Sequence, residues 1–184
     1  MTPWQLPDTA RIGDTEYEIN TDYRDILQIV KILNDLDKPE YVRWYEAICL
    51  FYEGDIPDEY EQEAMEYLAS FVSYGEIDTK PGPQLIDWDQ DARAIVADVN
   101  KVAGKEIRAL PHLHWWTFLS YFYAIGEGQL STIVSIRDKM RRGKKLEAWE
   151  QDFYRENKSR VELKKKYTAE ELAEQERLKK LLGG

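Results

Sequence analysis

The sequence predicts a mainly α-helical protein: a compact helical domain of about six helices with a small N-terminal β-hairpin and a helical C-terminal tail. Apolar residues recur at three- and four-residue spacing through most of the chain. Only one short segment alternates polar and apolar residues around a tight turn. The 184 residues are enough for one hydrophobic core without disulfides or metals.

The hairpin is predicted at the start of the chain. Residues 9–12 and 15–19 alternate polar and apolar side chains on either side of Gly13 and Asp14. A glycine beside an aspartate suits the tight turn between two antiparallel strands.

Three helices are predicted to follow, over about residues 22–37, 39–54 and 58–75. The aromatic-rich stripe of the second comprises Tyr41, Trp44, Tyr45, Ile48, Phe51 and Tyr52. The only cysteine, Cys49, lies within the apolar run 47–51 of this helix and is expected to be a small core residue. A single cysteine cannot form an internal disulfide, which indicates a reducing compartment.

A loop is expected over residues 75–85, because proline and glycine interrupt the periodicity there. The aspartates of 87–91 then open a fourth helix, and their negative charge suits a helix N-terminus. Their spacing imitates the start of a calcium loop, but Ala92 and Asp98 replace the glycine and glutamate that such a loop requires. We therefore expect no metal.

The fifth predicted helix, residues 113–125, carries apolar side chains on every face. Such a helix lies at the centre of a core or beneath a partner, and both interpretations stay open. In the first, Trp115 and Trp116 are structural. In the second, one face forms the wall of a binding groove, made of Trp115, Phe118 and Phe122. The opposite face then points inward, with Trp116, Leu119 and Tyr123.

The two histidines, His112 and His114, lie at the entrance to the fifth helix, where a capping or packing role is favoured over metal binding. No nucleophile, base and orienting group occur together, and no glycine-rich phosphate loop is present. We therefore expect a protein that is not an enzyme and uses no cofactor.

Charge divides the chain into an acidic body, predicted to comprise residues 1–143, and a basic tail, predicted to comprise residues 144–184. Residues 1–136 hold 10 basic and 25 acidic side chains, whereas residues 137–184 hold 15 and 10. An acidic body repels nucleic acid and anionic membranes, so neither is an expected partner. The chain shows no signal peptide and no apolar run long enough for a membrane span, which favours a soluble cytosolic protein.

The tail supplies further candidate contact residues. After the sixth predicted helix, Trp149 lies in an apolar stripe with Leu146 and Phe153. A capping box at Thr168 opens a last helix that runs to Leu182. One hypothesis makes this helix an arm that docks on the acidic body of a neighbouring copy. The candidate partner-binding residues of the tail are Trp149, Leu178 and Leu181.

Three segments resemble the gene product fifteen family of tailed bacteriophages and prophages of Gram-positive bacteria. The first is residues 12–24, with the step Asn-Thr-Asp-Tyr-Arg after the hairpin. The second is the aspartate-aromatic-aspartate run of 86–92. The third and most specific is Leu-His-Trp-Trp-Thr-Phe at 113–118, with the trailing Ile-Val-Ser-Ile-Arg at 133–137.

This resemblance implies a tail assembly chaperone in the host bacterial cytoplasm. Such a protein would bind the tape-measure protein and help recruit subunits of the tail tube. The resemblance supplies no catalytic residues. Two alternatives stay open: a phage adaptor or inhibitor that binds a host protein, and a minor structural component of the virion.

Overall fold

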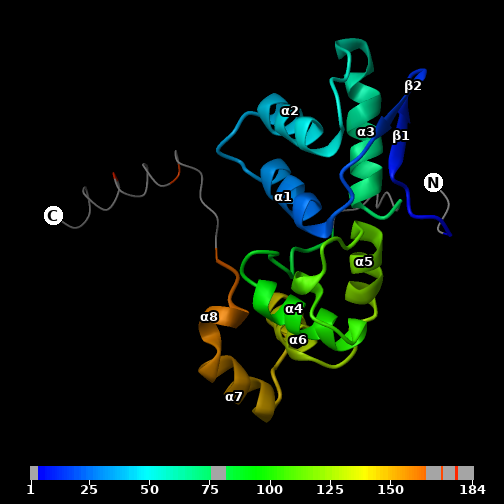
Figure 1. Cartoon of the computed structure of the whole chain (residues 1–184). Coiled ribbons are helices and arrows are strands. Elements are labelled where there is room, and N and C mark those ends of the chain that lie inside the picture. The colour runs from blue at the N-terminus through cyan, green and yellow to red at the C-terminus, as the bar shows by residue number, and fades with distance from the viewer. Residues whose placement is uncertain (1–3, 76–81, 165–170, 172–176, 178–184) are drawn as a thin grey trace.

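The computed structural model describes residues 4–75, 82–164, 171 and 177 (Figure 1). A two-stranded antiparallel hairpin, β1 (Thr9–Ile12) and β2 (Thr15–Glu18), precedes a chain of helices. The helices are α1 (Tyr23–Leu33), α2 (Glu40–Phe51), α3 (Glu61–Val72), α4 (Ala92–Ala103), α5 (Trp115–Tyr123), α6 (Gln129–Arg141), α7 (Ala148–Glu156) and α8 (Lys158–Val161), with 3-10 turns η1 (Asp58–Tyr60) and η2 (Ile107–Ala109). The predicted mainly α class and the hairpin are confirmed.

The hairpin lies along α3 (Figure 1). Its turn contains Gly13, whose φ of +56° is in the left-handed region that favours glycine. The turn also packs tightly against α3 and η1, because a Cβ on Gly13 would lie 2.6 Å from the ring of Tyr60. The Gly13 amide donates to the Glu63 carboxylate at 3.1 Å, which ties the turn to α3.

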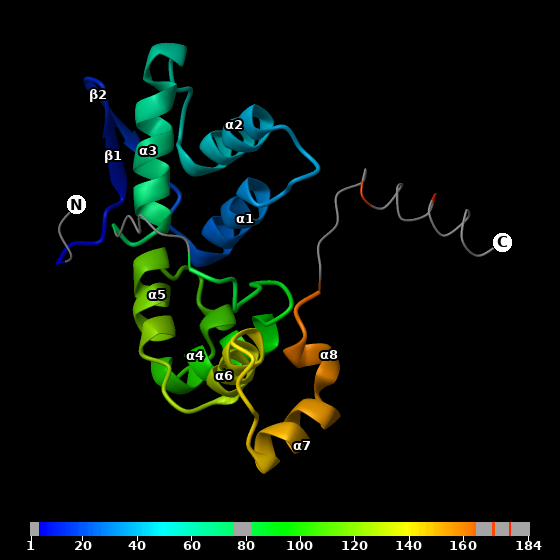
Figure 2. The ribbon, with the colours of Figure 1, turned by 180° about the vertical axis from the view of Figure 1, so that it is seen from behind.

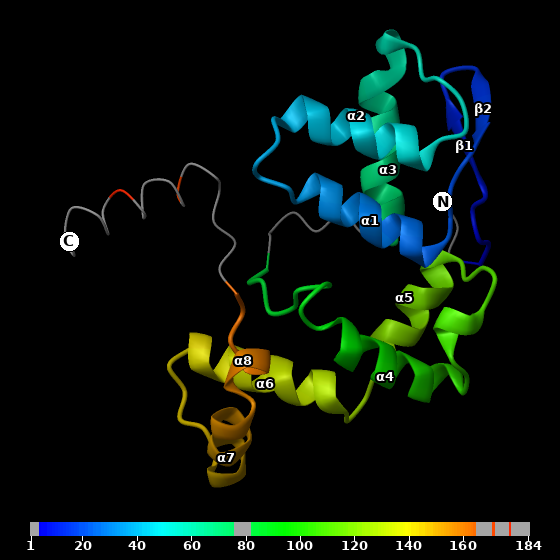
Figure 3. The same cartoon turned by 60° about the vertical axis from the view of Figure 1, so that its left-hand side comes forward.

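Helices α1 and α2 run side by side over α3 (Figure 3). The Asp22 side chain caps α1 by accepting from the Arg24 amide at 2.9 Å. The helix ends at Leu33, earlier than the predicted Asp37, and the side-chain amide of Asn34, its C-cap residue, donates to the Val30 carbonyl at 2.7 Å. The inner faces of these three helices supply Ile26, Ile29, Ala47, Phe51, Ala64, Leu68 and Phe71 to the core.

The second half of the chain packs beneath the first, with α5 directly under the end of α3 (Figure 2). Helices α4 and α6 lie against one another, and α4 also contacts α5. Asp98 of α4 is buried and accepts from the Leu130 amide at 2.8 Å, which satisfies a free N–H group at the start of α6. No helix within the described ranges is long and apolar enough to cross a lipid bilayer.

Helix α8 folds back on α6, α7 packs on α8, and Val161 of α8 is buried. The first part of the predicted tail, as far as Lys164, therefore packs on the body (Figure 3). The predicted helix over 168–182, with Leu178 and Leu181, lies outside the described residues.

Candidate partner-binding surface

The segment that follows the hairpin joins the segment that enters α5. The Tyr23 amide donates to the Leu113 carbonyl at 2.9 Å, and the Trp115 amide donates to the Thr21 carbonyl at 2.7 Å. The Asp22 carboxylate accepts from the Leu113 amide at 3.0 Å. Burial alone would raise the pKa of Asp22, but hydrogen bonds from Arg24 and Leu113 outweigh it and hold that pKa below its ordinary value. We call this contact the Asp22 junction.

A shallow depression of about 440 Å³ lies beside the Asp22 junction, lined by residues 19–22, Arg24, Asp25, Pro111 and His112. Most of its polar side chains have partners within the chain. The Asn20 amide donates to the Leu50 carbonyl, and the Thr21 hydroxyl lies 3.0 Å from His112 Nε2. The chemistry of this depression therefore indicates a structural joint and does not call for a ligand.

The aspartate run and the end of the third motif form a second junction. Arg137 of α6 and Asp91, the residue before α4, are both buried. Arg137 Nη1 and Nη2 donate to the two Asp91 carboxylate oxygens at 2.6 and 2.9 Å. Its Nε donates to the Val161 carbonyl at 2.6 Å, and the Leu85 and Arg160 carbonyls each accept a further bond. We call this contact the Arg137 junction.

The Arg137 junction is reinforced by two neighbours. The Gln90 side chain donates to the Glu162 carbonyl at 2.7 Å and accepts from the Lys164 amide at 3.0 Å. The buried Glu150 of α7 is paired with Lys139 of α6 at 2.7 Å, and this lysine lowers the pKa of Glu150. The three segments of family resemblance thus build the fold, and none of them leaves an unpartnered reactive side chain at these two junctions.

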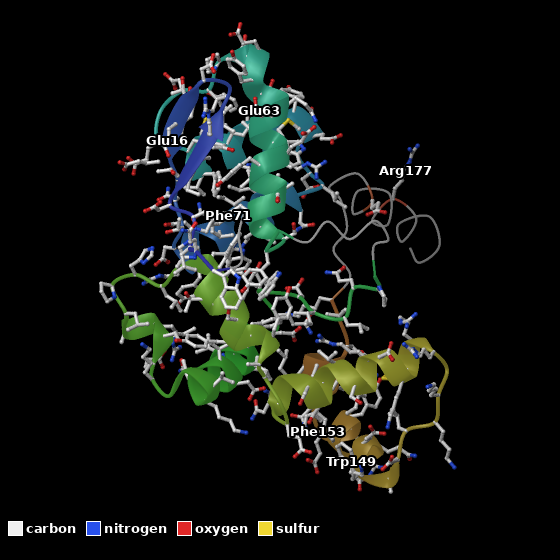
Figure 4. The ribbon with its side chains drawn as sticks, turned by 90° about the vertical axis from the view of Figure 1, so that its right-hand side faces the viewer. Glu16, Glu63, Phe71, Trp149, Phe153 and Arg177 are labelled. Atoms are coloured by element: carbon white, nitrogen blue, oxygen red, sulfur yellow. The ribbon has the colours of Figure 1, made fainter. Side chains whose placement is uncertain are left out.

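The structure buries four of the nine residues of α5, Trp115, Trp116, Phe118 and Leu119. Trp115 is 2% exposed, and its Nε1 donates to the Val72 carbonyl at 3.0 Å. Trp116 Nε1 donates to the Phe71 carbonyl at 2.9 Å, at the end of α3 that faces α5 (Figure 4). Phe118 is buried and stacks on Tyr23, with ring centroids 4.9 Å apart. The core interpretation of α5 therefore holds for these three residues.

The groove-wall hypothesis for α5 needs correction. Trp115 and Phe118 are unavailable to a partner because α3, α1 and Trp88 cover them. Phe122 is only half-buried and packs on Trp88, with centroids 5.1 Å apart. Tyr123, expected to face inward, is 64% exposed in the last turn of α5.

Trp149 is exposed on α7, as a partner-binding residue must be. Its side chain is 55% exposed, and its Nε1 donates to the Glu147 carboxylate at 3.0 Å. Phe153 is half-buried on the same helix (Figure 4). Trp149 therefore stays a candidate contact, although a single exposed tryptophan is ordinary for a protein surface.

Among the helices that the structure describes, α2 carries the two aromatic side chains with the highest exposed fraction. Tyr41 is 73% exposed and Tyr45 is 66% exposed, and Cys49 is exposed beside them. Residues four apart lie on one side of a helix, so these three form a continuous strip, which we call the tyrosine face. The Tyr45 hydroxyl is hydrogen-bonded to Cys49, and this bond raises the pKa of Tyr45.

The sequence prediction for this helix was wrong in two respects. Cys49 is not a core residue, and Tyr41 and Tyr45 are not part of the buried stripe. The buried side of α2 consists of Ala47, Ile48 and Phe51. One feature of the sequence could have indicated this exposure: apolar residues extend around more of α2 than one core contact can cover.

Acidic residues lie at both ends of the tyrosine face. Asp35, Asp37 and Glu40 precede or begin α2, and Glu53 and Asp55 follow it. The nearby cations are already engaged, since Lys38 pairs with Glu46 at 2.6 Å and Arg43 donates to the Leu33 carbonyl at 2.6 Å. A strip of rings between two acidic ends favours a partner segment with apolar residues in its middle and cations at its ends.

Comparison with known proteins assigns the chain to a family. The family model described as "Bacteriophage Gp15 protein" matches residues 4–163. No curated protein and no solved structure matched the sequence. Within the described ranges, no cluster of three or more histidine, cysteine or acidic side chains could hold a metal ion.

Proposed function

The chain belongs to the bacteriophage Gp15 family, and from this premise we propose that it is a non-enzymatic tail assembly chaperone. In this role it binds the tape-measure protein in the host bacterial cytoplasm and helps to bring tail-tube subunits to it. The family membership supports the coarser part of the proposal, a phage protein of a structural or assembly type.

The tyrosine face is the observation that supports the more specific part of the proposal, the binding of the tape-measure protein. Tyrosine is enriched in protein interfaces, because its ring supplies contact area at a small loss of conformational entropy and its hydroxyl tolerates water. A strip of rings along one helix suits an amphipathic helix laid against it, with apolar residues repeating every three or four positions. The long helical segments expected in a tape-measure protein have this character.

The acidic ends of the tyrosine face add selectivity. Charges at the rim of an interface mainly affect association rate and choice of partner. We therefore expect the chain to prefer client segments whose apolar stripe is flanked by lysine or arginine, and we expect this preference to weaken as salt is raised.

The test is co-expression of the chain with fragments of the neighbouring tape-measure protein and with the tail-tube subunit. Complex mass is measured by size exclusion with light scattering. A multi-copy complex with the tape measure is expected, and it should be lost when Tyr41→Ser and Tyr45→Ser are combined. Tyr123→Ser is the matched control, because it removes a tyrosine ring that is 64% exposed on another helix, α5.

Two outcomes would contradict the proposal. If the chain elutes alone from every tape-measure fragment, the chaperone role fails and a host protein becomes the better partner to seek. If the chain is a stoichiometric component of purified virions, it is a structural part of the particle and not an assembly factor.

A further inference from the structure

The end of α6 and the start of α7 form a surface with two exposed apolar side chains. Met140 is 40% exposed and Trp149 is 55% exposed. Lys139 of α6 pairs with Glu150 of α7 at 2.7 Å, which holds the two helix ends together. We call residues 138–150 the basic corner.

Cations are in excess on the basic corner, which holds five basic and three acidic side chains. Asp138 pairs with both Arg141 and Arg142, at 2.8 and 2.9 Å. Lys144 and Lys145 are exposed and form no ion pair with any residue in the described part of the chain. These two lysines are therefore available to a partner.

The tyrosine face has the opposite character. The segment 35–55, which contains it, holds six acidic and two basic side chains. Leu36, in the connection before α2, is 67% exposed and adds to the apolar area. The tyrosine face thus offers apolar contact area among acidic groups, whereas the basic corner offers apolar contact area among cations. Each surface has the composition that the other favours in a partner.

The two surfaces lie at opposite ends of the molecule. Helix α2 lies in the upper part and α7 at the lower end in Figures 1 and 3, and Figure 4 shows Trp149 at that lower end. The basic corner therefore cannot reach the tyrosine face of its own chain. It can reach only that of another copy.

Pairing either surface with its own kind is unfavourable. Two tyrosine faces brought together would place acidic groups against acidic groups, and two basic corners would place cations against cations. A head-to-tail contact between unlike surfaces avoids both. It also leaves one tyrosine face and one basic corner open at the ends of the assembly, so further copies can add unless the rotation closes into a ring.

We propose that this chain associates with copies of itself head to tail, with the basic corner of one copy docked on the tyrosine face of the next. A few exposed apolar side chains on each copy make a small interface, so the association is weak and weakens further as salt is raised. The contact does not depend on the proposed function, although it uses the same tyrosine face as the tape-measure client.

Sedimentation velocity of the full chain tests this contact. The average mass should rise with protein concentration past that of a dimer, and high salt should return it toward the monomer mass of 21.7 kDa. A face variant, Tyr41→Ser with Tyr45→Ser, and a corner variant, Met140→Ser with Trp149→Ser, should each stay monomeric. Tyr123→Ser alters neither surface and should behave as the unaltered chain. A mass that levels off at a dimer, or association that persists in either double variant, would overturn the proposal.

Mixing the two double variants tests the head-to-tail arrangement itself. The face variant keeps its basic corner and the corner variant keeps its tyrosine face. Equal amounts should therefore form a complex of twice the monomer mass that cannot add further copies. Unchanged melting temperatures show that both variants are folded. A folded mixture that stays monomeric, or one that forms larger assemblies, contradicts the arrangement.

A cysteine cross-link provides a second test that keeps the apolar side chains in place. Cys49 is exposed on the tyrosine face, so in Lys145→Cys a mild oxidant should join Cys49 of one copy to the new thiol of another. Lys105→Cys replaces an exposed lysine outside the basic corner and should form its bond to Cys49 roughly tenfold more slowly. Equal rates would refute the contact, because a disulfide requires Cα atoms less than about 7 Å apart.

These measurements separate the self-association from the proposed function. If the copies associate as described but no tape-measure fragment binds, the head-to-tail contact holds and the chaperone role fails. If a fragment binds but the chain stays monomeric at every concentration, the chaperone role holds and the contact fails. If both hold, the corner variant should still bind the fragment, and a saturating fragment should abolish the cross-link of Lys145→Cys because both partners occupy the tyrosine face.

Discussion

Arg137 of α6 donates two hydrogen bonds, of 2.6 and 2.9 Å, to the Asp91 carboxylate, although the two residues are 46 positions apart in the sequence. The remaining donors of the guanidinium end on the carbonyls of Leu85, Arg160 and Val161. One buried side chain thus joins the segment before α4, helix α6 and the chain that follows α7. Its charge and all of its donors are satisfied, which is the condition under which a buried ion can be tolerated.

Replacing Arg137 with methionine should destabilise the protein by roughly 3–5 kcal/mol, because Asp91 would be left buried without its partner. Urea denaturation followed by circular dichroism measures the loss. The double variant Arg137→Met with Asp91→Leu removes both charges and should recover a large part of it. If the single and double variants unfold at the same urea concentration, the unpaired charge is not the cause.

The cap of α5 should make stability depend on pH. His114 Nδ1 accepts from the Trp116 amide and its Nε2 lies 3.0 Å from the Pro7 carbonyl, so the ring is neutral with its proton on Nε2. Burial lowers the pKa of His114 below its ordinary 6.5.

His114 takes up a proton more readily in the unfolded chain than in the folded one. The contribution of its neutral form to the free energy of unfolding is therefore present above pH 6.5 and is lost as the pH falls below that value. The slope for one proton cannot exceed about 1.4 kcal/mol per pH unit. Urea midpoints at pH 7.5, 6.5 and 5.5 measure this. His114→Asn keeps an acceptor at the cap without titrating in this range, so its midpoint should change less; an equal slope would assign the effect to another group.

Trp116→Phe should cost about 1–3 kcal/mol, because it removes the hydrogen bond to the Phe71 carbonyl and leaves unfilled space in the core. Thermal unfolding measures the loss. Trp149→Phe changes the same side chain on the surface and should stay within about 0.5 kcal/mol of the unaltered protein. Similar losses in both variants would mean that α5 is not anchored on α3 as described.

Gly128→Ala should lower the melting temperature, because a Cβ there would lie 2.5 Å from the Asp98 carboxylate that caps α6. Crowding of this kind costs about 1–3 kcal/mol. Gly126→Ala is the matched control, since no atom lies within 4 Å of the added Cβ. A drop of equal size in both variants would indicate a backbone effect instead of the contact with Asp98.

Local patterns in the sequence predicted the elements but not their contacts. The hairpin turn at Gly13 and the helices as far as α6 follow from spacing and capping residues, each of which acts over a few positions. A capping or packing role was also predicted for the two histidines, and His114 is the cap of α5. The pairing of Arg137 with Asp91 could not be predicted, because nothing local to either residue specifies a partner 46 positions away.

The candidate surface was harder to predict than the fold. Spacing identified α2 as a helix, yet it could not decide which of its aromatic residues faces the core. Ile48 and Phe51 are buried because α1 and α3 lie on that side of α2, and this arrangement depends on the whole chain. The same limit applied to α5, where Phe118 packs on a tyrosine of a distant helix.

The Asp22 junction also limits when its contacts can form during translation. Asp22 and Leu113 are 91 residues apart, so the ribosome needs about 5–18 s to make the second after the first, at roughly 5–20 residues per second. In the later part of that interval, after Phe71 and Val72 have been made, their carbonyls have no indole to bind, and the adjoining end of α3 is uncovered. The end of α3 can therefore be covered by these two indoles only after more than half of the 184 residues have been made.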